Sequence, residues 1–82
     1  MVGFLTHFGR ITRVHQQYRG SSLHIVNEHG HMVTMGPQHP RRNSVARKAK
    51  ELMKLGVQVE IETPTRVKTY SGAKYFQDIH PV

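Results

Sequence analysis

Residues 43–62 read NSVARKAKELMKLGVQVEIE. The spacing of their apolar residues is that of a helix before Gly56 and that of a strand after it. Gly56 lies where a left-handed C-cap belongs, and residues 57–62 then alternate between apolar and polar side chains. The stretch therefore predicts an amphipathic helix followed by a half-buried strand. The apolar helix face consists of Val45, Ala46, Ala49, Leu52 and Met53.

The ends of this helix carry recognisable signals. Asn43 or Ser44 is the expected N-cap, and Lys54 in the last turn suits the negative end of the helix dipole. Arg41 and Arg42 oppose the dipole at the other end. A bound phosphate near the helix start would explain them.

Strand signals precede the helix. Residues 10–18 are rich in β-branched residues and predict a strand that a turn at 19–22 ends. Residues 23–28 and 31–35 flank His29-Gly30, which predicts a hairpin with a two-residue loop.

A second hairpin is expected after the helix. With Thr63-Pro64-Thr65 as its loop, Glu62 lies opposite Arg66 and Glu60 opposite Lys68, which would neutralise both cations. A short last strand is expected at 74–77. The fold class is therefore α+β, a small antiparallel sheet of about five strands with one amphipathic helix packed on it, in the order β-β-β-α-β-β.

Length and composition limit the class of protein. The 82 residues allow a single domain, 1–82, whose small core favours a homodimer. The absence of Cys excludes disulfides and thiolate zinc sites. We expect no membrane partner, because no apolar run approaches the roughly 20 residues of a spanning helix. The start lacks signal-peptide features, so we expect the cytoplasm.

Positive charge is the strongest functional signal. Twelve Lys and Arg against five Asp and Glu give a net charge of +7. Residues 1–50 carry all of this excess, while residues 51–82 are balanced. Nucleic acid is the polyanion that such a protein most often meets. The alternative is that a high pI only improves solubility.

The candidate nucleic-acid-binding residues come from three segments. Arg47, Lys50 and Lys54 form one line on the helix, and Glu51 is placed to pair with Arg47 or Lys48. We expect the cations to converge on one open surface without carboxylate partners, with Tyr18 able to stack a base. The full set is Arg10, Arg13, Tyr18, Arg19, Arg41, Arg42, Arg47, Lys48, Lys50 and Lys54.

Histidine is abundant, but catalytic motifs are few. His24, His29 and His31 offer metal-ligand spacing without a carboxylate to orient them, so we expect no metal, no cofactor and no catalytic residue. A metal-free ribonuclease needs little more than a histidine and a cation. His24 or His39 beside Arg41 and Arg42 would supply them.

One partial resemblance supports that alternative. Residues 19–24 (RGSSLH), a strand, Gly30, then His39-Pro40 and a basic helix resemble the HicA-type mRNA-interferase toxins. The resemblance covers under half of the chain and implies a double-stranded-RNA-binding-like fold with a catalytic histidine, whose position would have to match Ser22 or be displaced to His24. The chain departs from the family because it begins with strand-like residues instead of a helix.

The sequence favours a small, non-enzymatic RNA-binding protein that contacts backbone phosphates. RNA is preferred to DNA because the chain shows no helix-turn-helix pair. By analogy, such proteins act as phage or mobile-element regulators or inhibitors. One alternative is a protein-binding inhibitor that uses its basic face against an acidic or nucleic-acid-binding partner. The other is the metal-independent ribonuclease.

Overall fold

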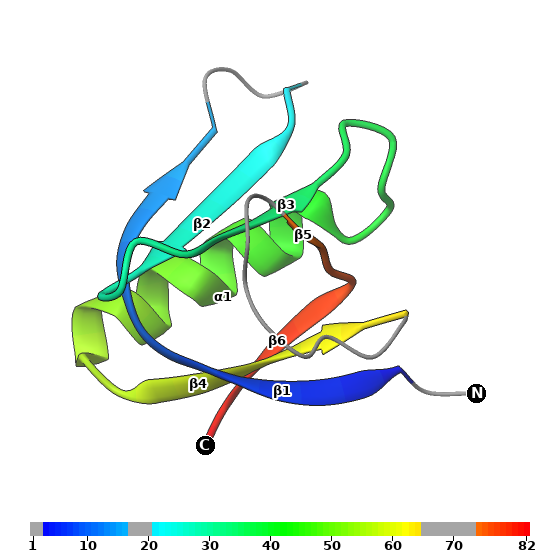
Figure 1. Cartoon of the computed structure of the whole chain (residues 1–82). Coiled ribbons are helices and arrows are strands. Elements are labelled where there is room, and N and C mark those ends of the chain that lie inside the picture. Colours follow the sequence, from blue (N-terminus) through cyan, green and yellow to red (C-terminus); the bar gives the residue numbers. More distant parts are fainter. Residues whose placement is uncertain (1–2, 17–20, 65–73) are drawn as a thin grey trace.

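The computed structural model describes residues 3–16, 21–64 and 74–82, in which one helix covers one face of a six-stranded sheet (Figure 1). The strand order is β5-β3-β2-β1-β4-β6, and every pair is antiparallel except β3 with β5. The predicted α+β class and element order are confirmed, with β6 as one further strand. The elements are β1 (Phe4–His15), β2 (Leu23–Asn27), β3 (Met32–Met35), α1 (Arg42–Leu55), β4 (Gln58–Thr63), β5 (Lys74–Tyr75) and β6 (Asp78–Pro81).

Strand β1 joins the two halves of the sheet. Its first part pairs with β4, and its second part pairs with β2. The β4 register shifts between His7 and Gly9, and Gly9 has a φ of 97°, a conformation that glycine adopts without strain. Gly9 therefore forms a bulge inside one long strand, whereas the sequence predicted a strand that began only at Arg10.

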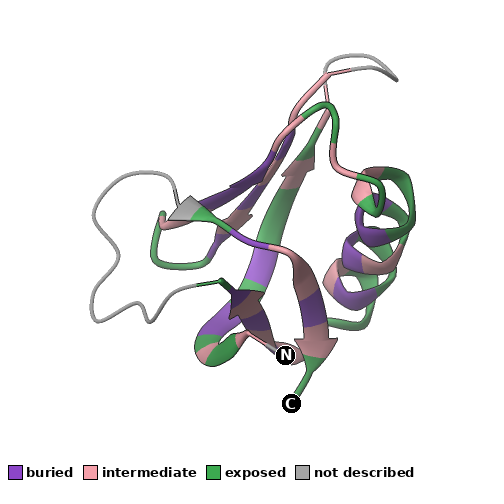
Figure 2. Cartoon of the chain, turned by 90° about the vertical axis from the view of Figure 1, so that its right-hand side faces the viewer, coloured by how far each residue is buried: buried purple, intermediate pink, exposed green. Residues whose placement is uncertain are grey.

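Helix α1 packs its apolar face on the sheet, and buried residues of the two layers face each other in Figure 2. The predicted helix face is confirmed, with Met53 only partly buried. No other helix occurs in the described parts of the chain, and α1 is not long and apolar enough to cross a membrane. The core is formed by Phe8, Ile11, Leu23, Ile25, Val33, Met35, Val45, Ala46, Ala49, Leu52, Val59, Ile61, Phe76 and Ile79.

The two ends of α1 differ in how far they follow the prediction. Gly56 has a φ of 68°, and its N–H donates to the carbonyls of Leu52 and Met53 at 3.1 Å, so the C-cap is confirmed. The N-cap prediction is wrong. Arg41 occupies the N-cap position without a side-chain capping bond, and Ser44 Oγ donates to the Arg41 carbonyl at 3.0 Å.

Four residues, 28–31, connect β2 to β3, more than the two that the sequence predicted. The Asn27 N–H donates to the His31 carbonyl at 3.0 Å, and Gly30 has a φ of 80°. Buried Asn27 organises this loop, because its Oδ1 accepts the His29 and His31 N–H groups at 3.0 and 2.8 Å. Its Nδ2 donates to the Phe8 carbonyl at 2.6 Å and ties the loop to β1.

Strand β4 has β1 on one side and β6 on the other. Glu62 lies between Leu5 and Asp78 in the two ladders. The predicted partners Arg66 and Lys68 lie outside the described residues, and both edges of β4 are occupied by strands other than 66–70.

Candidate nucleic-acid interface

Three cations form a line on the outer face of α1. Arg47, Lys50 and Lys54 are exposed and project away from the buried side of the helix. No side-chain hydrogen bond or ion pair joins any of them to another described residue, and the predicted pairing of Glu51 with Arg47 or Lys48 is not formed. The line spans about 10 Å along the helix axis, at about 1.5 Å per residue. We call these three residues the helix cation line.

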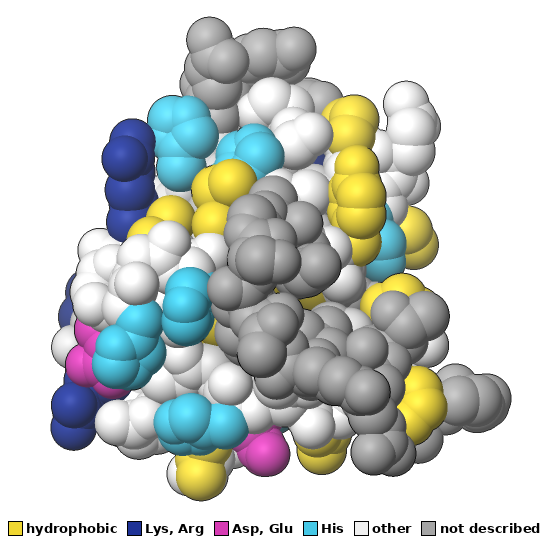
Figure 3. All heavy atoms as spheres, viewed as in Figure 1, with side chains coloured by type: hydrophobic (Ala, Val, Ile, Leu, Met, Phe, Trp, Pro, Cys, Tyr) yellow, Lys and Arg dark blue, Asp and Glu magenta, His cyan; other side chains and the backbone are white. Residues whose placement is uncertain are grey.

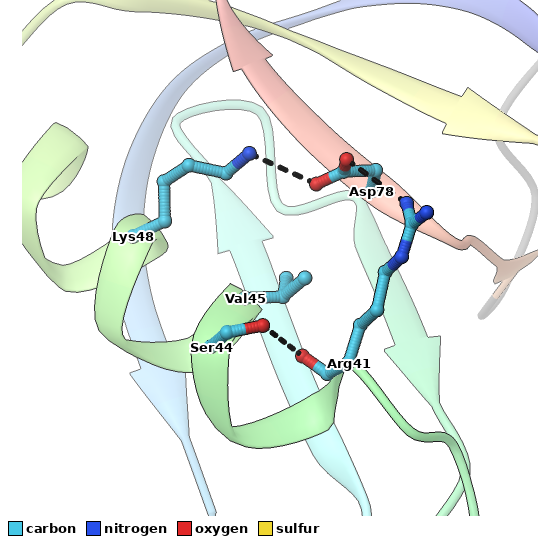
Figure 4. Close-up of a pocket in the computed structure, with 5 residues that line it drawn as sticks. All are labelled: Arg41, Ser44, Val45, Lys48 and Asp78. Carbon is cyan, nitrogen blue, oxygen red and sulfur yellow. Dashed lines mark hydrogen bonds and ion pairs between the residues drawn. The ribbon is translucent and has the colours of Figure 1, made fainter.

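On the β6 side of α1, two further predicted cations already have a partner (Figure 4). Lys48 Nζ lies 2.9 Å from Asp78 Oδ1, and Arg41 Nη1 lies 3.2 Å from Asp78 Oδ2. These three residues line a surface pocket of about 370 Å³ together with Ser44 and Val45. The expectation that Arg41 and Lys48 lack carboxylate partners is therefore wrong.

Asp78 also supplies the negative charge near the start of α1 that the sequence had assigned to a bound phosphate. The first turn of α1 contains no acidic residue, and the Asp78 carboxylate from β6 is bonded to the N-cap residue Arg41. Desolvation by burial raises the pKa of Asp78. The hydrogen bonds from Lys48 and the Ile79 N–H, with the charges of Lys48 and His80, outweigh this and hold the pKa below its ordinary value.

Arg10 lies at the other end of the helix and is also engaged. Its Nε donates to the Gly56 carbonyl at 3.0 Å, and its Nη1 lies 3.7 Å from Glu28 Oε2. Arg10 therefore caps the helix C-terminus and has a nearby carboxylate, contrary to the expectation for a free phosphate-binding cation.

Arg13 lies on the sheet face opposite α1. It stands opposite Val26 in the β1–β2 ladder, whereas the neighbouring pair Val14 and Ile25 faces the core. The prediction that all cations converge on one surface is therefore wrong. Arg42 is half-buried, and Tyr18 and Arg19 lie outside the described residues.

Histidines gather on the helix-free sheet face, which is turned toward the viewer in Figure 3. His24 is on this face, and its Nδ1 lies 2.6 Å from Thr34 Oγ1. It therefore lies across the sheet from helix α1. His39 does lie next to Arg41, because its Nδ1 accepts the Arg41 N–H at 3.1 Å.

The cluster with metal-ligand geometry is not formed by His24, His29 and His31, whose spacing in the sequence suits metal ligands. In residues 3–16, 21–64 and 74–82, only Glu62, Asp78 and His80 bring three ligand atoms within 4.8 Å of one another. The sequence missed this cluster because it requires the β4–β6 pairing. Asp78 is already bonded to Lys48, and Glu62 Oε2 accepts Gln77 Nε2 at 2.7 Å. Both carboxylates thus already have hydrogen-bond partners inside the protein.

Glu62 is held in its charged form by this network. The Gln77 hydrogen bond is the largest influence, and together with the hydrogen bond and charge of His80 it lowers the pKa of Glu62 despite desolvation and the nearby Asp78 charge. His80 Nε2 lies 3.3 Å from Glu62 Oε1. The cluster therefore connects β4 to β6 as a polar network.

Comparisons of the chain with protein-family models, with curated proteins and with solved structures gave no match. The fold also departs from the toxin family that the sequence resembled. The described chain opens with β1, so that family's first helix has no counterpart in residues 3–16.

Proposed function

We propose that this protein binds nucleic acid, with RNA preferred, through backbone phosphates on the outer face of α1. The observation that supports it best is the helix cation line, whose three side chains are exposed and have no partner among the described residues. In the described residues, by contrast, Arg10 is paired with Glu28, and Arg41 and Lys48 are paired with Asp78. The net charge of +7 adds a favourable long-range field.

The length of the line suits a phosphate backbone. A line of three cations about 10 Å long can neutralise about three backbone phosphates, one for each side chain. Three neutralised phosphates correspond to a slope of about −2 to −3 in a plot of log K against log salt, at roughly 0.7 to 0.9 per phosphate. Such binding is weak and independent of sequence.

The test is a titration of labelled single-stranded RNA, duplex RNA and duplex DNA at several salt concentrations. We expect Arg47→Gln combined with Lys50→Gln to reduce the slope by about 1.5 to 2. The matched control is Arg10→Gln combined with Arg41→Gln, which removes the same charge from cations that already have carboxylate partners. We expect the control to change the slope by less than about 0.5.

Two outcomes would overturn the proposal. A flat salt response, or no binding at low salt, removes nucleic acid as the ligand. Equal losses in the two double variants show that total charge, not the helix cation line, determines binding. Circular dichroism of each variant checks that the fold is intact.

The alternative functions remain predictions with their own tests. A protein-binding inhibitor would bind a partner protein and show no salt-dependent RNA affinity. A ribonuclease would cleave labelled RNA in the presence of chelator, and His24→Ala would abolish the cleavage. Homodimer formation, a phage regulatory role and location in the cytoplasm also remain predictions.

A further inference from the structure

A shallow hollow of about 230 Å³ lies on the helix-free face of the sheet. Three neighbouring strands line it, β1 with Arg13 and His15, β2 with His24 and Val26, and β3 with Met32. Figure 3 shows histidine and hydrophobic side chains side by side on this face. We call these five residues the sheet-face pocket.

The composition of the sheet-face pocket is complementary to a flat, anionic ligand. Val26 and Met32 are half-buried and give it apolar surface, while Arg13 and two imidazoles supply nitrogen donors. Among the described residues no carboxylate lines it, in contrast to the pocket beside α1, which contains Asp78. The volume is below the roughly 300 to 1,000 Å³ of typical small-molecule sites, so it fits one nucleotide better than a larger cofactor.

His24 is oriented for contact with a ligand. Its Nδ1 is engaged by Thr34 Oγ1 at 2.6 Å, which fixes the ring and leaves Nε2 available. The ring of His15 lies 6.4 Å away between centroids and is tilted by 32°. The two imidazoles therefore form adjacent planar surfaces of the kind on which nucleobases stack.

Arg13 provides the anion-binding group. It is exposed, and no ion pair joins it to another described residue. A planar guanidinium binds phosphate through two parallel hydrogen bonds. Arg13 stands opposite Val26, so a phosphate on Arg13 places the attached base over Val26 and Met32.

We propose that the sheet-face pocket binds one unpaired nucleotide of single-stranded RNA, with the phosphate on Arg13 and the base on Val26, Met32 and His24. This inference deepens the proposed function, which it takes as its premise, by adding a site for an unpaired base. A base inside a duplex cannot reach the pocket, whereas single-stranded RNA exposes its bases. The pocket therefore selects single strands, while the helix cation line accepts any phosphate backbone.

Backbone amide NMR spectra of the full chain test this proposal with uridine monophosphate and with a hexameric oligouridylate. We expect both probes to shift the amide signals of the sheet-face pocket. The mononucleotide should leave the amide signals of residues 47–54 unchanged. Arg13→Gln and Val26→Glu should each weaken mononucleotide binding at least fivefold. Arg10→Gln on the same strand is the control, because Arg10 is paired with Glu28.

The outcomes separate the two proposals. If the hexamer binds and depends on Arg47 and Lys50, but neither probe shifts the pocket amides, the inference fails and the proposed function stands. If uridine monophosphate shifts the pocket amides, but substitution of Arg47 and Lys50 leaves duplex affinity unchanged, the inference stands and the proposed function fails. Equal weakening by Arg13→Gln and Arg10→Gln also overturns the inference, because it indicates attraction by total charge.

Discussion

Lys48 and Asp78 are 30 residues apart in the chain, and their side chains meet at 2.9 Å. Asp78 also accepts hydrogen bonds from Arg41 Nη1 at 3.2 Å and from the Ile79 N–H at 2.8 Å. One carboxylate from the last strand thus pairs with two cations, Arg41 at the start of α1 and Lys48 near its middle. Charge balance along the chain is therefore a poor guide to charge balance on the surface.

Asp78→Asn should destabilise the fold by about 1 to 2 kcal/mol, because it removes the charge from hydrogen bonds that connect β6 to α1. Both cations are partly exposed, with 57% and 40% of the Arg41 and Lys48 side chains accessible, which limits the loss. Urea unfolding measures it. A double-mutant cycle with Lys48→Met isolates the pair, and a coupling energy near zero would contradict this role.

Acid should destabilise the protein through Glu62 and Asp78. Both have pKa values below their ordinary values, so each contributes stability above its unfolded pKa of about 4. This contribution is lost as the pH falls through the folded pKa values. We expect the free energy of unfolding to change little between about pH 5 and 7 from these groups and to fall below about pH 4.

Gln77→Ala provides the specific test of that pH dependence. It removes the hydrogen bond that lowers the pKa of Glu62 most, so the Glu62 carboxyl should titrate closer to its ordinary value in an NMR titration. The Asp78 carboxyl should titrate over the same pH range as before, because Gln77 is not among its partners. An unchanged Glu62 titration would show that His80 alone holds the carboxylate.

The helix and β4 could be predicted because their apolar periods are local properties of residues 43–62. The site was harder to predict, since it depends on which strands pair. The bulge at Gly9 extends β1, and β6 occupies the edge of β4 that the sequence had assigned to a hairpin. Arg13 therefore lies across the sheet from Arg47, although both belong to the same basic half of the chain.

Asn27 should be the most sensitive polar position in the described chain. Its side chain is buried, donates to the Phe8 carbonyl and accepts two loop N–H groups. Asn27→Ala leaves these groups without partners and should cost about 2 to 3 kcal/mol. Asn27→Asp keeps the acceptors but loses the donor to Phe8, so it should also destabilise. Thermal unfolding measures both, and a loss below about 0.5 kcal/mol would mean that water replaces the side chain.

Gly56→Ala should cost about 1 kcal/mol, because the C-cap needs a φ of 68° that alanine adopts only with strain. Apart from its chain neighbours, no described residue has an atom within 4 Å of an added Cβ at Gly56, so the cost is conformational. Gly36→Ala is the matched control, since Gly36 has equal space and no positive φ. Urea unfolding should show Gly36→Ala as neutral or slightly stabilising, and equal losses would contradict the αL explanation.

The two proposed surfaces lie on opposite sides of the sheet, which makes their contributions to RNA binding separable. Arg47 and Lys50 project from the outer face of α1, whereas Arg13 lines the sheet-face pocket. Independent sites add in free energy to within about 0.5 kcal/mol. If one long single-stranded RNA contacts both surfaces, the triple variant Arg13→Gln, Arg47→Gln and Lys50→Gln should lose the sum of the losses of Arg13→Gln and the double variant. The salt slope should fall by about 2 in total, at roughly 0.7 per phosphate of a single strand. A triple variant that binds as well as the weaker of its two parents would show that a bound strand occupies only one surface at a time.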